Sequence, residues 1–330
     1  MATTGNTYLS LTDLFKQQQG GEVTATIIEM LAQLNPILQD MIVQECNSGA
    51  THLTTVRTGL PEATWRELYQ GVQPSKSTTT QVTDKTGMLE AWSEVDSKLV
   101  ALAGNGAGQF RLNEASAFLE GMSNEMSTTL FYGSAANQFT GLAPRFNSLS
   151  AESGEQIIDA GGTGSINTSI WMVVWGERTC HGLYPKGTMA GLVREDKGMQ
   201  TKTNADGSIY DVHREKFNWD LGLTVRDWRY VSRVANIDSA AVVAGTVDLY
   251  KFLRKAYYKL YQRRIAGGNA AIYCNSDIME ALDALATNAG TTDNFVRLKY
   301  TEIEGAEVLT YRGIPIRETD ALLNTESRVV

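Results

Sequence analysis

Two segments rich in threonine and valine, residues 51–59 and 77–95, limit most strongly how this 330-residue chain can fold. Their composition is typical of β-strands, yet they contain few large apolar side chains. A two-stranded ribbon this polar cannot form a hydrophobic core of its own. We therefore expect the ribbon to gain stability by lying on another surface, and the simplest such surface is another copy of the chain.

The segment between these strands is predicted to be a short helix that begins at Pro61 and ends at Gly71. Aromatic and arginine side chains often provide much of the binding energy of a protein interface. A ribbon with open strand edges is also a liability for a free monomer. We therefore expect this region to contact a neighbouring subunit, through Arg57 on the first strand and through Trp65, Arg66, Leu68 and Tyr69 at the tip.

The rest of the sequence predicts an α+β protein. Residues 1–21, rich in threonine, glutamine and glycine, are expected to form an extended arm. Helices are predicted over residues 23–34, from Pro36 to about residue 46, and over 113–132, 246–264 and 276–288. A loop is predicted over 137–168, and strands are predicted over 170–175, 219–235, 271–274 and 298–320, with a hairpin turn at Asn204–Gly207. Helices and antiparallel strands are thus segregated along the chain, which is typical of the α+β class.

No pattern of residues indicates a catalytic, cofactor-binding or metal site. His52, His181 and His213 have no partners at the spacing of metal ligands. The glycine-rich segments 104–108 and 161–164 lack the phosphate-binding fingerprint, and we expect them to be loops. The three cysteines lie far apart in the sequence, so buried thiols are expected rather than a disulfide framework. An enzyme remains an alternative, but the sequence offers no constellation of ionisable groups to support it.

The charge of the chain argues against a protein that grips nucleic acid. Its formal net charge is −8 at pH 7, whereas such proteins are usually basic. Residues 251–264 are an exception, with six basic side chains and no acidic one. This helix could face nucleic acid, but we favour a solvated or subunit-facing side of a core helix. The sequence shows no secretory signal and no stretch of about 20 apolar residues that could cross a membrane, so we expect a protein made in a cytoplasm.

Several motifs occur in an order and spacing that are specific in combination. In the ribbon region they are Gly59-Leu60-Pro61, Trp65-Arg66, Gly71-Val72 and Pro74-Ser75-Lys76-Ser77. Further along they are Phe131-Tyr132-Gly133, Phe139-x-Gly141-Leu142, Tyr184-Pro185-Lys186-Gly187, Gly191-Leu192, Trp219-x-Leu221-Gly222-Leu223, Arg226-Asp227, Arg229 and Arg233-Val234-Ala235-Asn236-Ile237-Asp238. This series, from about residue 50 to the C-terminus, resembles the major capsid proteins of short-tailed and related tailed bacteriophages.

The resemblance implies the Hong Kong 97 capsid fold. It assigns residues 1–50 to an N-terminal arm and helices, and residues 51–95 to an extended ribbon loop. Residues 96–330 would form a peripheral and an axial lobe, with a long spine helix over 113–132. The order in which the chain connects the lobes stays open.

The resemblance also implies a structural function. Copies of the chain would form the hexamers and pentamers of an icosahedral phage head that encloses double-stranded DNA, touched without sequence preference. The implied partners are a scaffold, a portal and optionally a decoration protein, with no cofactor and no membrane. The protein would be assembled in the bacterial cytoplasm and reside in the virion. The alternative is the shell of a bacterial nanocompartment that encloses a cargo enzyme.

Overall fold

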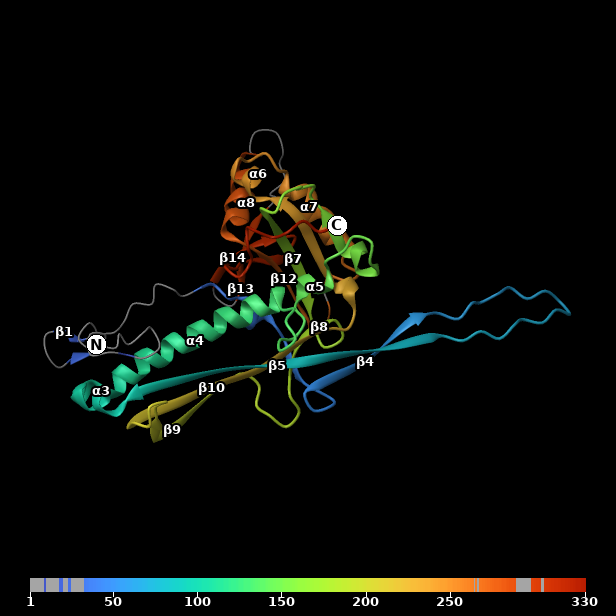
Figure 1. Ribbon diagram of the computed structural model, residues 1–330. Coiled ribbons are helices and arrows are strands. Elements are labelled where there is room, and N and C mark those ends of the chain that lie inside the picture. Colours follow the sequence, from blue (N-terminus) through green and yellow to red (C-terminus); the bar gives the residue numbers. More distant parts are fainter. Residues whose placement is uncertain are drawn as a thin grey trace.

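A single large β-sheet connects the parts of the molecule (Figure 1). The computed structural model describes residues 9, 18–19, 23–24, 33–263, 265, 267–288, 298–303 and 306–330. Within this part the strands are β1 Gln18–Gln19, β2 Val23–Thr24, β3 Val43–Glu45, β4 Thr51–Gly59, β5 Thr78–Asp96, β6 Ile157–Asp159, β7 Asn167–Trp175, β8 Cys180–Tyr184, β9 Leu192–Thr203, β10 Ile209–Val225, β11 Val231–Asp238, β12 Asn269–Cys274, β13 Lys299–Ile303, β14 Ala306–Tyr311 and β15 Ile314–Glu318. The helices are α2 Ile37–Asp40, α3 Ser97–Leu102, α4 Ala107–Tyr132, α5 Leu142–Arg145, α6 Ser239–Val243, α7 Leu249–Lys259 and α8 Ser276–Asn288, with 3₁₀ turns at Gly104–Gly106, Glu152–Gln156 and Trp228–Tyr230.

The strand order of the large sheet is β13-β14-β15-β12-β7-β8-β10-β5-β4. Off this path, β11 pairs with β7, β3 pairs with β8, β9 pairs with β10, and β6 pairs with β11. The sheet therefore runs from the half that carries α6, α7 and α8 through the centre of the body to the ribbon of β4 and β5, which projects away from the body (Figure 1).

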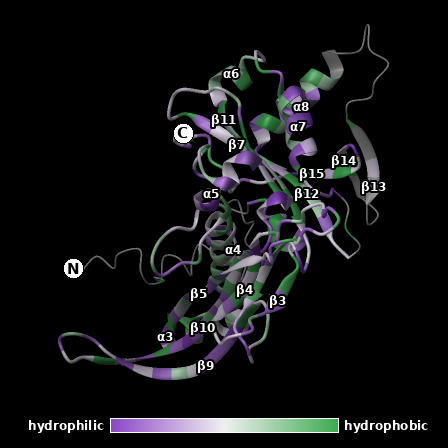
Figure 2. Cartoon of the chain, turned by 90° about the vertical axis from the view of Figure 1, so that its right-hand side faces the viewer, coloured by the Kyte–Doolittle hydropathy of each residue, from purple (hydrophilic) through white to green (hydrophobic). Residues whose placement is uncertain are grey.

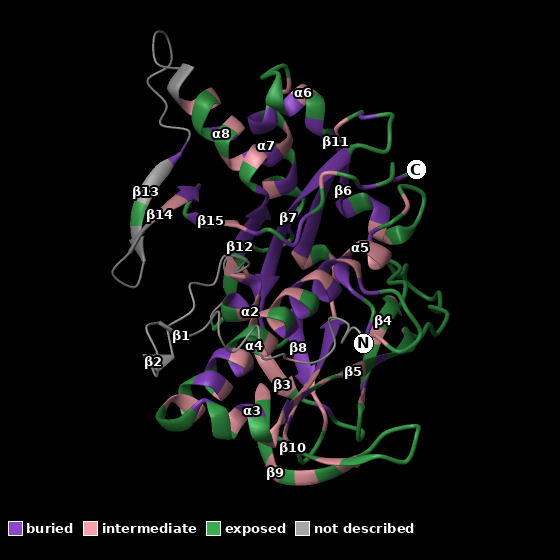
Figure 3. Ribbon diagram, turned by 60° about the vertical axis from the view of Figure 1, so that its left-hand side comes forward, coloured by how far each residue is buried: buried purple, intermediate pink, exposed green. Residues whose placement is uncertain are grey.

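The body has a hydrophobic core on each side of β7, which is buried along its whole length. Ile170, Met172 and Val174 face a core that is completed by α7 and α8. The alternate residues, Trp171 and Val173, face the C-terminal end of α4 and the last residues of the chain. Successive side chains of a strand point to opposite faces, so one apolar strand can serve both cores. Figure 3 shows this central block of buried strands.

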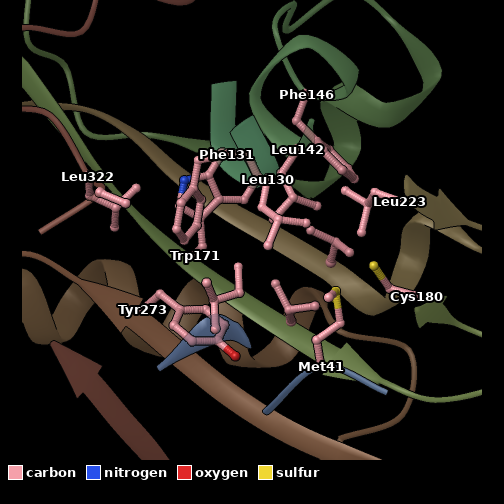
Figure 4. Close-up of a cluster of buried hydrophobic side chains, with 14 of the residues drawn as sticks. Met41, Leu130, Phe131, Leu142, Phe146, Trp171, Cys180, Leu223, Tyr273 and Leu322 are labelled. Atoms are coloured by element: carbon pink, nitrogen blue, oxygen red, sulfur yellow. The ribbon is translucent and has the colours of Figure 1, made fainter. Parts of the chain in front are cut away.

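The second of these cores gathers aromatic side chains from distant parts of the chain (Figure 4). The ring of Phe131 from α4 lies 6.4 Å from Trp171 and 6.0 Å from Tyr273, measured between centroids. The Tyr273 hydroxyl accepts a hydrogen bond from Trp175 Nε1 (2.8 Å) and donates one to the buried Asp40 (3.0 Å). The polar ends of Trp175 and Tyr273 are therefore satisfied inside the core, whereas the buried Trp171 Nε1 has no hydrogen-bond partner among the described residues.

Helix α4 is the longest helix of the described residues and follows the sheet. Its 26 residues correspond to a length of about 39 Å. Phe118 stacks on Phe217 of β10, and Met122 packs in the same small cluster. The helix ends at Gly133, where an added Cβ would lie 2.6 Å from the carbonyl oxygens of Thr129 and Phe139. Only glycine fits this contact between the helix end and the following loop.

Several helices predicted from the sequence differ in the structure. Val23 and Thr24 lie in a strand, and the rest of the predicted helix over 23–34 falls almost entirely outside the described residues. The helix after Pro36 ends at Asp40, because Val43–Glu45 pairs with β8 instead. Helix α4 begins at Ala107, six residues before the predicted start, since Phe110 is buried against Val95 and Leu99 and draws the glycine-rich segment into the helix.

Two further predictions are wrong. The predicted helix from Pro61 to Gly71 is absent: this described segment forms no helix. A helix this short is marginal in water unless one face is packed, and every residue from 60 to 71 is exposed. The predicted strand 219–235 is two strands, β10 and β11, separated by the 3₁₀ turn Trp228–Tyr230.

Other predicted elements are confirmed. Strands β4 and β5 occupy the two threonine-rich segments, and α8 spans the predicted residues 276–288. The hairpin turn lies between β9 and β10, with Gly207 at a φ of 84°. The predicted loop 137–168 is wrong in part, because this segment contains α5, a 3₁₀ turn, β6 and the first residues of β7. Along α7 and α8 hydrophilic and hydrophobic residues alternate, as expected for helices with one buried face (Figure 2).

Candidate subunit interface

The ribbon is one continuous extension of the sheet. Strand β5 is 19 residues long, which corresponds to about 63 Å. Residues Thr86–Asp96 of this strand pair with β10 inside the body, and residues Thr78–Lys85 pair with β4 in the projection. The same strand therefore forms one half of the ribbon and also pairs within the body, so the ribbon is directly continuous with the main sheet.

The tip of the ribbon, residues 60–77, makes few contacts of its own. Trp65 and Tyr69 are fully exposed and Leu68 is almost so. The tip is held by short-range hydrogen bonds, such as Arg66 Nε to the carbonyl of Gln70 (2.8 Å) and Ser75 Oγ to the carbonyl of Glu62 (2.9 Å). Tyr69 has a φ of 67°, a left-handed conformation that is unfavourable for a bulky residue. Three large apolar side chains are thus presented to solvent on a thin support.

The structure separates the five residues that the sequence indicated as subunit contacts. Trp65, Arg66, Leu68 and Tyr69 lie together in the tip loop. Arg57 lies lower on β4 beside a groove of about 760 Å³. The groove is lined by residues 54–60 of β4, by Glu152 and by Arg178, Arg226, Asp227, Trp228 and Arg229.

Sequence reasoning missed the arginines that share this groove with Arg57. Arg226, Asp227 and Arg229 were visible as part of a motif series, but the sequence gave no sign that they lie opposite β4. Arg229 forms a two-pronged ion pair with Asp227 (2.9 and 2.7 Å). Arg226 donates to the carbonyl of Glu177 (3.0 Å) and to His52 Nε2 (2.7 Å). Residues more than 150 positions apart are brought together only by the packing of β4 against the loop after β10.

A buried polar cluster joins the root of the ribbon to the body. His52 of β4 and His181 of β8 are both buried, with ring centroids 5.9 Å apart. Asp84 of β5 accepts hydrogen bonds from Arg145 (2.8 Å) and from Thr224 (2.5 Å). Burial, and then the positive charge of Arg226, lower the pKa of His52. Burial followed by the charges of Arg226 and His52 lowers the pKa of His181 to about 4, against a weaker opposing effect of Asp84.

This cluster predicts a stability that falls in mild acid. The unfolded chain binds a proton on His181 below about pH 6.5, whereas the folded chain does so only below about pH 4. The unfolding free energy should therefore decrease as the pH falls from 6.5 to 4, by about 3 kcal/mol from His181 alone. Denaturant unfolding of wild type and of His181→Gln at several pH values measures the difference. The variant should show a smaller loss between these pH values, and equal losses would contradict the assignment. His213→Gln, on β10, is the matched control.

The basic helix predicted from the sequence is α7. It buries Leu249, Leu253 and Ala256 in the core of the body. Its basic side chains Lys251, Arg254, Lys255 and Lys259 are exposed on the opposite side. This arrangement is the one expected of a core helix with a solvated face.

The described residues hold no group of three or more histidine, cysteine, aspartate or glutamate side chains that could bind a metal ion. Cys46, Cys180 and Cys274 are buried free thiols. Burial raises the pKa of the Cys180 and Cys274 thiols to about 12, which keeps them protonated and unreactive at neutral pH. No helix of the described part is long and apolar enough to span a membrane.

Comparisons with known proteins agree with this geometry. The family model described as "Major capsid protein GP7" matches residues 17–330. A protein chain in the structure of bacteriophage Epsilon15 is 35% identical, with a TM-score of 0.81 over 100% of this chain and 99% of that one. The capsid of a native GTA particle and a chain of Mycobacterium phage Adephagia are 8% and 10% identical. The GTA capsid match has a TM-score of 0.45 and covers 67% of this chain and 95% of that chain. The Adephagia match has a TM-score of 0.44 and covers 68% of this chain and 97% of that chain. No curated protein sequence matches the chain.

The family and the Epsilon15 match confirm the α+β capsid fold of the Hong Kong 97 type. They also decide between the two kinds of shell in favour of the phage head over the nanocompartment. This family is structural and is not an enzyme class. The chain therefore belongs to the GP7 family of major capsid proteins and forms the shell of a bacteriophage virion together with copies of itself.

Proposed function

We propose that the chain assembles into hexamers and pentamers of an icosahedral head around double-stranded DNA. One observation carries the proposal: a ribbon projects from the body and ends in the exposed side chains of Trp65, Leu68 and Tyr69. Exposure of such side chains on a monomer is unfavourable by about 25 cal/mol for each Å² of apolar surface. Docking on a neighbouring subunit removes this surface from water and gains the energy of assembly.

In this proposal the chain is divided as the sequence indicates. Residues 1–50 would be the N-terminal arm and helices, although residues 1–32 lie almost entirely outside the described part of the chain, and residues 51–95 would be the extended ribbon loop. Residues 96–330 form the peripheral and axial lobes, and the segment 113–132 of α4 is the spine helix.

The five subunit contacts have distinct proposed roles. Trp65, Leu68 and Tyr69 insert apolar surface into a neighbour, and Arg66 provides a charged hydrogen-bond donor beside them. Arg57 contacts the neighbour lower on the ribbon. A heterologous contact of this kind, repeated around a ring, closes into pentamers or hexamers when its rotation permits.

The further partners follow from the role of a head. We propose that a scaffold directs assembly and that a portal occupies one vertex, with a decoration protein as an optional addition. Packaged DNA touches the inner surface only through its phosphates, without sequence preference. The net charge of −8 supports this, since an acidic shell does not bind a polyanion tightly. We propose no catalytic activity and no cofactor for this chain.

Expression of the chain, alone and with its scaffold, tests this function. Negative-stain microscopy should show closed shells, rings or sheets, and particles from infected cells should contain double-stranded DNA. A chain that stays monomeric at high concentration in the presence of scaffold would refute the proposal. Particles that contain a co-purified enzyme and no DNA would point to the nanocompartment instead.

A further inference from the structure

Strand β4 ends the sheet with an open edge. Among the described residues it pairs with β5 on one side only. Thr86 N donates to the carbonyl of Ala50 (3.0 Å), which fixes the phase of the ladder. In an antiparallel pair the backbone groups of alternate residues point toward the partner strand. Thr54 and Val56 therefore direct their N–H and C=O groups to β5, whereas Leu53, Thr55 and Arg57 direct theirs away from it.

At the start of this edge, the side chain of Asn47 bonds to the outward-pointing backbone groups of Leu53. It accepts a hydrogen bond from Leu53 N and donates one to Leu53 O, both 2.8 Å long. Thr55 and Arg57 have no such partner within the described part of the chain, so their four backbone groups remain open. Residues 54–60, which contain these groups, line the groove of about 760 Å³ beside β4.

The groove is basic and large enough for an extended segment. Four arginines, Arg57, Arg178, Arg226 and Arg229, line it against two carboxylates, Glu152 and Asp227. Asp227 is already bound to Arg229. Arg57 and Arg178 are exposed and make no ion pair with another described residue. A strand with open hydrogen-bonding groups beside two free guanidinium groups fits an extended peptide that carries carboxylates.

We propose that this groove binds an extended acidic segment of a second copy of the chain, which adds a strand to the edge of β4. The inference rests on the proposed self-assembly and adds a second contact that is separate from the tip. A sister chain has a net charge of −8, which complements the basic groove. A long open edge would promote uncontrolled association of free subunits, and pairing in the shell removes it.

The backbone part of the proposal predicts different effects for neighbouring proline variants. Thr55→Pro removes an N–H that points into the groove, so the β4–β5 ladder should stay intact and the subunit should melt as wild type does. The concentration of subunit needed for assembly should rise at least tenfold. Val56→Pro is the matched control, because it removes an N–H directed at β5 and should loosen the ribbon itself, seen as faster hydrogen exchange along β5.

The charge part is tested by Arg178→Glu. This variant should raise the concentration needed for assembly at least tenfold, although its tip residues 60–77 are those of wild type. Lys98→Glu is the control, since Lys98 is also exposed but lies on α3 and does not line the groove. A photo-crosslinker at position 55 of wild-type particles should link β4 to an acidic segment of another copy. A crosslink to a different protein would overturn the choice of occupant.

These experiments separate the inference from the proposed function. Thr55→Pro and Arg178→Glu subunits that assemble at the wild-type concentration, or a crosslinker that captures nothing, would show that the groove is not an interface. The proposed function would stand in that case, because the tip variants test it independently. A wild-type chain that forms no particle would instead refute the function itself.

Discussion

The double variant Trp65→Ala/Arg66→Ala is expected to lose assembly while keeping the stability of the isolated subunit. Both side chains are exposed at the tip and contribute nothing to either core. Residues at the centre of an interface commonly cost about 2 kcal/mol or more when they are cut back to alanine. Such a loss at each contact raises the concentration needed for assembly about 30-fold, and a shell repeats the contact in every subunit. Light scattering and negative-stain microscopy measure this effect.

The melting temperature of the subunit is the decisive second measurement. It should change by less than 1 °C in the double variant, because no buried contact is lost. Trp65→Phe, which keeps an aromatic ring, is the conservative control and should retain most of the assembly. A large drop in melting temperature with the double variant would show that the tip belongs to the core of its own subunit and would overturn its placement at the interface.

Glu326→Ala is expected to destabilise the folded subunit by about 3–5 kcal/mol. Glu326 forms an ion pair with Arg233 (2.8 Å), and the side chains of Arg233 and Glu326 are 4% and 5% exposed. Its carboxylate also accepts hydrogen bonds from Tyr132 (2.5 Å) and from Ser169. Burial and the negative charge of Glu326 raise the pKa of Tyr132 above its ordinary value, so the hydroxyl remains a donor. Removal of the carboxylate leaves a buried guanidinium without its counter-charge.

The same residue ties the C-terminal segment to the body. Glu326 N donates to the carbonyl of Asn167 (2.9 Å), and Leu323 N donates to the Tyr132 hydroxyl (3.1 Å). Denaturant unfolding should therefore show the loss of stability, and proteolysis should become faster near residues 320–330. Glu195→Ala is the matched control, because Glu195 pairs with Lys197 at the surface and should cost less than about 1 kcal/mol. An unfolding free energy within 1 kcal/mol of wild type for Glu326→Ala would contradict the network.

Local sequence predicted those elements whose structure depends on their own pattern. The threonine-rich strands β4 and β5 and the helix α8 fall where the composition and spacing place them. The turn that precedes β10 was predicted from Asn204–Gly207, because glycine there adopts a positive φ at little cost. The lack of large apolar residues in the ribbon likewise indicated that it cannot stand as a core.

Elements that depend on contacts with distant residues were not predictable in this way. The tip resembles a helix in sequence, but it has no surface to pack on and stays irregular. Gly108 lies inside α4 although glycine disfavours helices, because Phe110 is held in a cluster with Val95 and Leu99. The strand predicted over 219–235 breaks at Trp228–Tyr230, and the chain resumes as β11, which pairs with β7, whereas β10 pairs with β8.

The sequence by itself determined that this chain carries a polar ribbon with an apolar tip, and its ordered motifs identified the capsid fold. Only the tertiary structure decided that Arg57 faces Arg178, Arg226 and Arg229 across a groove. Only it paired His52 with His181, and Arg233 with Glu326. The physical reason is that strand composition acts over a few residues, whereas a groove or a buried ion pair needs partners whose separation in sequence carries no local signal.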